Sequence, residues 1–289
     1  MVHIHYDLSL VVGSILFALL ACLMVVSLEQ LLFRGSQQKL HKVILVTSGL
    51  VLGVAIWCMH FIAIFACQFP ESFSIDLGLT LTSYLIAFVA STFAIWLITR
   101  PTLSFARLIM GAVLMGLGIS GMHYTGMLAL KLPSYHIQYD AMMVVFSIIF
   151  AICGSGLTFW LTFKYKAAIK YKFWLKLCIA FMMAISIVGM HFSGMAATKF
   201  VQDSTDLLNL GQSGYGLIVF TVLLVTSLIF IAAFFVAVLE QRLEERNIQL
   251  YTANQELAKQ AVRDNLTKLP NRLYLAEYAH FLFTNHRYN

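Results

Sequence analysis

Met122-His123-Tyr124-Thr125-Gly126-Met127 is the stretch from which the fold of this chain can be worked out, because two relatives of it occur elsewhere in the sequence. The relatives are Met59-His60-Phe61-Ile62-Ala63-Ile64 and Met190-His191-Phe192-Ser193-Gly194-Met195. A random order of 13 Met and 9 His in 289 residues would give only about 0.4 Met-His pairs. Three pairs, each within a long apolar stretch, therefore indicate a repeated structural unit.

The composition around the repeats identifies the class of protein. Hydrophobic residues make up 60% of the chain and charged residues 11%, with a mean hydropathy of +0.84. A soluble core cannot bury that much apolar surface, so the chain is predicted to lie in a bilayer. Seven stretches without Asp, Glu, Lys or Arg are long enough to cross a bilayer as helices: roughly 8–28, 43–66, 77–99, 108–130, 141–163, 177–198 and 212–239.

The Met-His pairs are 63 and 68 residues apart, which is the length of two membrane spans with their loops. We predict an all-α, seven-transmembrane helical bundle of three helical hairpins plus a seventh helix. Each histidine lies near the end of an even-numbered span, so the three are expected at one depth. A small residue seven positions earlier, Gly53, Gly116 or Ala184, predicts that the even-numbered spans approach one another closely. General glycine enrichment in membrane helices is the competing explanation.

Charges in the short loops predict the orientation. The basic loops are assigned to the cytoplasm and carry Arg34, Lys39, Lys42, Arg100, Arg107, Lys164, Lys166, Lys170, Lys172 and Lys176. The opposite loops carry Lys131 and Lys199 beside Asp7, Glu71, Asp76, Asp140, Asp203 and Asp206. The N-terminus is therefore expected outside, and everything after residue 240 inside. The net charge of +6 then indicates lipid contact, and no nucleic-acid partner is expected.

The repeated motif has the side chains of a soft metal site. His123 and Met127 are four residues apart and share a helical face, as do His191 and Met195. A methionine directly before each histidine points about 100° away and needs a neighbouring helix to reach the same ion. Imidazole and thioether ligands select copper, above all its reduced ion, and no predicted span contains a carboxylate for Mg²⁺ or Ca²⁺.

The first repeat departs from the other two, because Ala63 and Ile64 stand where the others have Gly and Met. It supplies a histidine and the preceding methionine but no methionine one turn later. The sequence therefore predicts a site built mainly from the fourth and sixth spans, with His60 assisting. Cys67 lies two turns, about 10 Å, beyond His60 and is too far away to share its ion.

Beyond residue 240 the sequence is polar and rich in helix-forming residues. Leu243, Leu250 and Leu257 are seven residues apart, and Asn247, Asn254 and Ala261 complete an a/d seam. This pattern predicts a cytoplasmic parallel coiled coil that joins two copies into a homodimer. An isolated amphipathic linker helix is the competing interpretation.

The Met-His-Tyr-Thr-Gly-Met string at 122–127, with its relatives and flanking spans, resembles the MHYT domain over residues 6–235. The resemblance implies a sensor in the bacterial cytoplasmic (inner) membrane that holds copper near its outer face and senses O₂, CO or NO. The metal ligands that it implies are Met59, His60, Met122, His123, Met127, Met190, His191 and Met195.

The segment 264–272, Asp-Asn-Leu-Thr-Lys-Leu-Pro-Asn-Arg, resembles the opening signature of a GGDEF domain, the fold of diguanylate cyclases. The expected division is 1–239 for the membrane sensor, 240–262 for the coiled-coil linker and 263–289 for the start of the GGDEF domain. The catalytic turn of that family would lie beyond Asn289, so this chain is expected to have no enzymatic activity. An intact parent is expected to make or degrade cyclic di-GMP.

Two other functions remain open from the residues alone. Two of the histidines on facing helices are also a pair of axial ligands for haem. A metal or small-molecule transporter is the third hypothesis, against which stands the lack of acidic or basic residues in the predicted spans. The seventh span lacks the lysine of a retinal protein, and no acidic group completes a Ser/His/Asp triad within the spans.

Overall fold

The computed structural model describes residues 5–33, 38–69, 73–100, 102–169, 173–202, 242–243, 245–258, 269, 271–272 and 274–276 of the chain. The chain divides into two compact units, Met1–Phe230 and Ile231–Asn289. The predicted seventh span, 212–239, lies outside the described residues.

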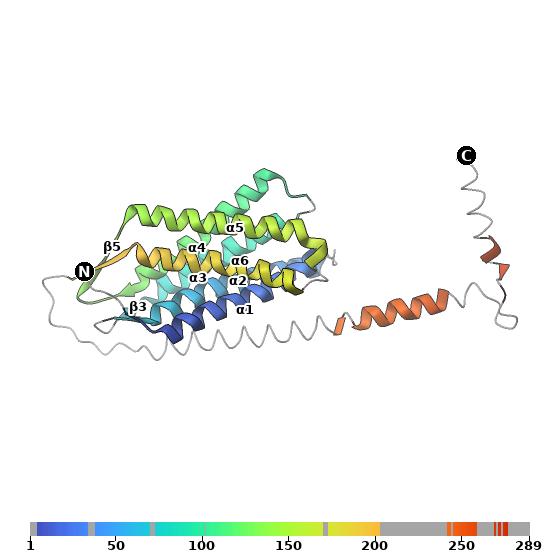
Figure 1. Ribbon diagram of the computed structural model, residues 1–289, viewed down its shortest axis with the longest axis horizontal. Coiled ribbons are helices and arrows are strands. Elements are labelled where there is room, and N and C mark those ends of the chain that lie inside the picture. The colour runs from blue at the N-terminus through green and yellow to red at the C-terminus, as the bar shows by residue number, and fades with distance from the viewer. Residues whose placement is uncertain are drawn as a thin grey trace. The chain divides into compact units, whose positions relative to one another are not determined.

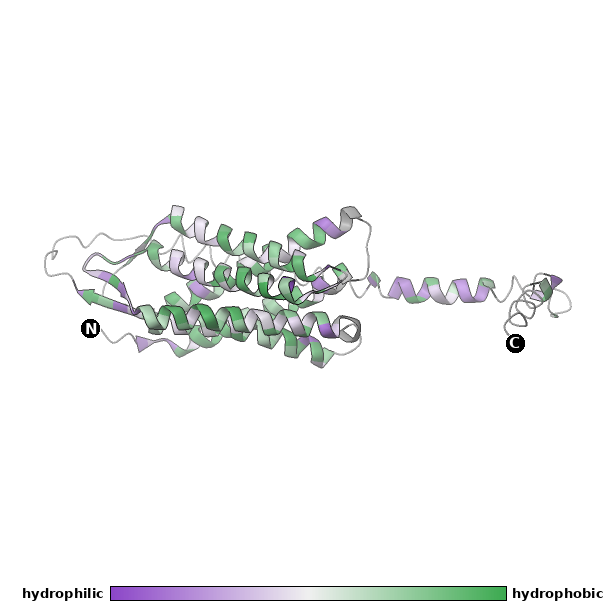
Figure 2. Ribbon diagram, turned by 90° about the horizontal axis from the view of Figure 1, so that it is seen from above, coloured by the Kyte–Doolittle hydropathy of each residue, from purple (hydrophilic) through white to green (hydrophobic). Residues whose placement is uncertain are grey.

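The described residues of the first unit form six long helices (Figure 1). They are α1 (Leu8–Phe33), α2 (Gln38–Phe65), α3 (Leu77–Ile98), α4 (Phe105–Ala129), α5 (Ala141–Ile169) and α6 (Phe173–Ala196). All six are long and apolar enough to cross a membrane, and Figure 2 shows the apolar residues running along the bundle. The first six predicted spans are thereby confirmed as helices.

Short strands join the helices at one end of the bundle, called here the strand end (Figure 1). They are β1 (His5–Tyr6), β2 (Cys67–Gln68), β3 (Ser74–Ile75), β4 (Leu130–Lys131), β5 (Tyr135–Tyr139) and β6 (Thr198–Gln202). Three antiparallel pairs form, β1 with β2, β3 with β4 and β5 with β6. Each pair joins the strand before an odd-numbered helix to the strand after the next even-numbered helix. The chain is thus three equivalent hairpins, 5–68, 74–131 and 135–202, called here repeats 1, 2 and 3.

An aspartate begins the odd-numbered helix of every repeat: Asp7, Asp76 or Asp140. Its carboxylate accepts hydrogen bonds from backbone N–H groups in the first turn, which have no partner inside the helix. Its own N–H donates to the carbonyl of an alanine at the end of the even-numbered helix, Ala66, Ala129 or Ala197, over 2.8, 2.9 and 2.8 Å in repeats 1 to 3. Each aspartate therefore fixes the two helices of its hairpin to each other at the strand end.

The six helices form a closed ring, because each contacts its neighbours in the chain and α1 also contacts α6. The even-numbered helices α2, α4 and α6 contact one another as well, so they form the inner part of the bundle. The expectation that the three Met-His helices gather round one axis is confirmed.

The small residues predicted to bring these helices together have a different role. A Cβ atom added at Gly53 would meet the backbone of Phe88 in α3 at 2.8 Å, and one added at Gly116 would meet the backbone of Ile152 in α5 at 2.7 Å. These glycines let an inner helix approach the odd-numbered helix of the next repeat. The predicted close approach is found at Gly53 and Gly116, but the predicted partner was wrong. Each glycine faces an outer helix and not another inner helix.

Within the second unit, residues 245–258 form a helix, as the sequence predicts for the linker. Leu250 and Leu257 are both 62% exposed. Pairing of this helix with a second copy stays a prediction, as does the domain division at residues 239 and 262.

Candidate metal centre

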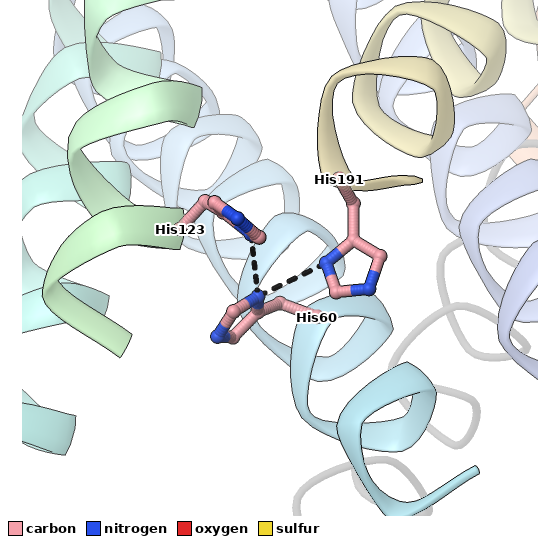
Figure 3. A group of neighbouring side chains, drawn as sticks. All are labelled: His60, His123 and His191. Carbon is pink, nitrogen blue, oxygen red and sulfur yellow. Dashed lines mark hydrogen bonds between the residues drawn. The ribbon is translucent and has the colours of Figure 1, made fainter. Parts of the chain in front are cut away.

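Three histidines from three helices point toward one another inside the bundle near its strand end (Figure 3). His60 comes from α2, His123 from α4 and His191 from α6, and each is at most 1% exposed. The Nδ1 atom of His60 lies 3.0 Å from Nδ1 of His123 and 3.1 Å from Nδ1 of His191. The predicted common depth is confirmed, and the three side chains form a single cluster.

The two hydrogen bonds of the cluster share one atom, Nδ1 of His60. A neutral imidazole nitrogen carries either one hydrogen or one lone pair, so the two hydrogen bonds share the single hydrogen or the single lone pair of this atom. His60 is therefore the central member, and it connects His123 to His191. The sequence predicts that His60 only assists a site built from the fourth and sixth spans. For the arrangement of the three histidines this prediction is wrong, because the ring of His60 lies between the other two although its repeat differs at positions 63 and 64.

The second ring nitrogen of each histidine, Nε2, is buried and has no hydrogen-bond partner among the described residues. A buried polar atom without a partner costs about 1–3 kcal/mol, and such atoms in native proteins call for an explanation. When Nε2 carries the proton, the Nδ1 lone pair of each ring is free and faces the centre of the cluster. Three lone pairs directed at one point are stabilised by a cation.

The donor set fits a metal ion. Ligand nitrogens at about 2.0–2.1 Å from an ion with tetrahedral angles are roughly 3.3 Å apart, which is close to the 3.0 and 3.1 Å between Nδ1 of His60 and Nδ1 of His123 and His191. One ligand nitrogen from each of the three rings lies within 4.8 Å of the others, and no other group of three His, Cys, Asp or Glu residues in the described part of the chain gathers so closely. Imidazole suits copper, zinc, iron and nickel.

The predicted methionine ligands fall into two sets. Met59, Met122 and Met190, next to the histidines in sequence, are buried in the inner helices. Met127 and Met195, one turn beyond the histidines, belong to an apolar cluster at the strand end. The cluster, called here the apolar cap, consists of Ile64, Cys67, Met127, Leu130, Leu132, Met195 and Phe200. The structure thus brings the three histidines together, while the methionine part of the ligand set stays a prediction.

The apolar cap separates the histidines from the strand pairs. Ile64, Met127 and Met195 each follow a histidine by one helical turn toward the strand end, and all three are at most 5% exposed. Burial raises the pKa of the Cys67 thiol to about 12, so this sulfur is protonated at neutral pH and is a poor ligand in that form. The cap excludes water from one side of the cluster and places thioether sulfur there.

On the other side of the cluster lies a cavity of about 10 Å³ among α4, α5 and α6. Ile119 and Ile187 form part of its wall, one helical turn before His123 and His191. Its volume is near the minimum that holds a single water molecule. The three histidines are at most 1% exposed, so an uncompensated charge among them is costly and a bound cation must be held by these side chains.

Glu29 is a buried acidic residue that the sequence-based description of the spans missed. The apolar stretch ends at residue 28, but α1 continues to Phe33 and includes Glu29 in its candidate span. The side chain is 0% exposed, and neither carboxyl oxygen has a hydrogen-bond partner among the described residues. The prediction that the spans contain no carboxylate is wrong here, and the argument against a transporter that used it loses that premise.

Residues 53–111 and 116–170 match the MHYT family, described as a bacterial signalling protein N-terminal repeat. The first range contains His60 and the second His123, while His191 lies beyond both. No solved structure matches the chain.

Several curated proteins are similar to this chain. The bifunctional diguanylate cyclase/cyclic di-GMP phosphodiesterase MucR of Pseudomonas aeruginosa is 40% identical over 240 residues, which cover 80% of this chain and 34% of that protein. The cyclic di-GMP phosphodiesterase NbdA of the same bacterium is 33% identical over 172 residues, covering 55% and 22%. The signaling protein YkoW of Bacillus subtilis is 29% identical over 205 residues, covering 70% and 25%. The chain thus spans about a third or less of these relatives, and its residues 53–111 and 116–170 are MHYT repeats of the kind found in bacterial signalling proteins.

Proposed function

We propose that this chain is a membrane sensor module that binds a copper ion at His60, His123 and His191. The observation that carries the proposal is the convergence of three buried imidazoles whose Nδ1 atoms lie 3.0 and 3.1 Å apart around His60. Methionines near the cluster favour the reduced ion, because thioether sulfur is a soft ligand. Met59, Met122, Met127, Met190 and Met195 complete the proposed ligand set.

A single ion suits the cluster better than haem. A porphyrin has to pass between its two axial ligands, whereas Nδ1 of His60 is in hydrogen-bond contact with both other rings. Haem binding therefore requires the inner helices to separate. A Soret band in the purified protein would decide for haem.

The proposed signal is a diatomic gas, O₂, CO or NO, or a change of redox state. One ligand comes from each repeat, so the ion would hold three hairpins together at one point. A gas or redox change that alters how the ion is held shifts the packing of α2, α4 and α6, provided that its affinity differs between two packings. The segment 212–262 is proposed to carry this change onward as a seventh helix and a dimeric coiled coil.

The setting of the module follows from its surface and its relatives. Leu85, Val89 and Phe93 of α3 form an exposed apolar stripe, 54%, 61% and 44% exposed, of the kind that contacts membrane lipid. We place the chain in the bacterial inner membrane, with its strand end and N-terminus outside and residues after 240 in the cytoplasm. MucR and NbdA are named for cyclic di-GMP metabolism, so we propose that residues 263–289 begin a GGDEF domain whose intact parent acts on that nucleotide.

Metal analysis of detergent-purified protein tests the proposal. We expect a single copper ion per chain, a strongly reduced metal content in His60→Ala, His123→Ala and His191→Ala, and no change in the control His5→Ala, whose side chain is exposed in β1. Wild-type protein that contains no copper and takes none up when supplied would remove the basis of the proposal. Full metal content in all three histidine variants would show that the ligands are assigned wrongly.

A further inference from the structure

Two glycines of the repeated motif lie directly against rings of the histidine cluster. A Cβ atom added at Gly126 of α4 would overlap Nε2 of His60 and lie 2.9 Å from its Cδ2. One added at Gly194 of α6 would lie 2.5 Å from Nε2 of His123 and 2.9 Å from its Cδ2. Ordinary contacts of a Cβ atom begin at 3.4 Å, so neither position has room for even a methyl group.

These two contacts follow one rule. Each glycine comes three residues after the histidine of its own repeat, and it faces the histidine of the preceding repeat. The His60 ring of repeat 1 thus packs against Gly126 of repeat 2, and the His123 ring of repeat 2 packs against Gly194 of repeat 3. The corresponding position in repeat 1, which would face His191 if the cycle closes, is Ala63, and it is 0% exposed.

The rings cannot move away from these glycines at low cost. An imidazole is rigid, and the edge of the His60 ring opposite Nε2 includes the Nδ1 atom that lies 3.0 and 3.1 Å from its two neighbours. A push on the Nε2 side therefore either drives Nδ1 into these neighbours or turns the ring out of the cluster. The backbone of the next inner helix thus fixes the direction in which Nδ1 points.

We propose that Gly126 and Gly194 are positioning residues of the metal centre. Because neither has a side chain, the Nε2 edges of His60 and His123 pack directly against the helix backbone there, and this packing orients the two rings. Repeat 1 has Ala63 instead of glycine at the corresponding position, so the inference is confined to His60 and His123. The inference rests on the proposed role of the cluster as a ligand set.

The first test reads the histidines themselves in metal-free protein labelled with ¹⁵N at histidine. Wild type should show ¹⁵N–¹⁵N coupling across the two Nδ1···Nδ1 hydrogen bonds, and Gly126→Ala should abolish both, because they share His60. Gly194→Ala should remove only the bond between His123 and His60. Gly111→Ala is the matched control in α4, because a Cβ atom there makes an ordinary contact of 3.5 Å with the Phe159 ring. Couplings in Gly126→Ala equal to those of wild type would overturn the inference.

Copper affinity gives a second reading of the same variants. We expect a loss of about tenfold or more in Gly126→Ala, equivalent to 1.4 kcal/mol, and no loss in Gly111→Ala. If wild type binds no metal, the proposed function fails, yet the histidine couplings still test whether Gly126 and Gly194 orient the two rings. If wild type binds metal and Gly126→Ala binds it equally well, only the inference fails.

A double-mutant cycle covers the case in which Gly126→Ala does not fold by itself. Combined with His60→Ala, the added methyl group has no ring to displace, so the double variant should be more stable than the sum of the two single effects predicts. The control cycle uses Gly116→Ala with His60→Ala, which should be additive because Gly116 faces the backbone of Ile152. Equal destabilisation by Gly126→Ala with and without His60 would contradict the inference.

Discussion

Repeat 1 and the other two repeats share strand pairing, an aspartate at the start of the first helix and a buried histidine near the end of the second. Four of the equivalent positions at which they differ concern the buried groups and the strand end. Repeat 1 has Glu29, Ala63, Ile64 and Gln68 where repeat 2 has Ile98, Gly126, Met127 and Lys131, and where repeat 3 has Thr162, Gly194, Met195 and Lys199. Nevertheless, the histidine of repeat 1 is the centre of the cluster. Departures in the residues around His60 thus do not move its ring from the centre of the cluster.

The largest expected effect comes from removing that central histidine. In metal-free protein, His60→Ala should lower the stability by about 3 kcal/mol, because it creates a cavity and leaves Nδ1 of both His123 and His191 unpaired. His123→Ala and His191→Ala each leave one hydrogen bond of the cluster intact and should cost less. Thermal unfolding in detergent measures the order, and equal losses in all three would contradict the central place of His60.

The second difference between the repeats is the buried carboxyl group of Glu29. Glu29→Ile copies repeat 2 at this position and should raise the stability by about 1–3 kcal/mol, because two buried oxygens without partners disappear. Glu29→Gln keeps unpaired polar atoms in the same place and should give no such gain. A loss of stability in Glu29→Ile would mean that the carboxyl group has a stabilising role in the folded protein.

The third difference is the thioether one turn beyond the histidine. Met127→Leu and Met195→Leu conserve volume within the apolar cap and should cost less than about 1.5 kcal/mol of stability. If the sulfur atoms bind the ion, Cu(I) affinity falls by about tenfold or more in either variant and rises in Ile64→Met, which gives repeat 1 the missing sulfur. Competition with a Cu(I) chelator measures this, and unchanged affinity would remove both methionines from the ligand set.

The smallest effect is expected at the strand end, where Lys131 contacts Asp76 at 2.9 Å and Lys199 contacts Asp140 at 3.4 Å. Repeat 1 has the neutral Gln68 instead. Lys131→Gln and Lys199→Gln should each lower the thermal midpoint only slightly, because the pairs are exposed, and the loss should shrink in high salt.

These contacts also give a pH dependence. The hydrogen bond from Lys131 holds the pKa of Asp76 below its ordinary value of 3.8, and backbone N–H groups followed by Lys199 lower that of Asp140. A carboxyl group with a lowered pKa stabilises the fold fully above its ordinary pKa and loses this contribution as the pH falls through the lowered value. The thermal midpoint should therefore drop in acid, less steeply in Lys131→Gln. Identical acid profiles for this variant and wild type would show that the pair does not stabilise the fold.

The first six helices and the common depth of the three histidines could be predicted, because both depend on local patterns in the sequence. Long apolar stretches define the helices, and the repeat spacing places three histidines at one depth on helices that run in the same direction. The packing of the His60 ring against Gly126 could not be predicted, because it depends on which face of α2 meets α4. Glu29 was missed because the helix continues past the point where hydropathy falls. The strand pairs were missed because strands of two to five residues carry too little pattern.

The central claim is that one ion is held by one imidazole from each of the three repeats. X-ray absorption at the copper edge of copper-loaded, detergent-purified protein tests it most directly, since it counts the nearest neighbours of the ion and detects imidazole rings through their outer atoms. The account predicts one copper ion per chain with three imidazole nitrogens in its first shell, and the loss of this signal in His60→Ala. A first shell with a single imidazole, or one separate ion at each of the three Met-His pairs, would contradict it.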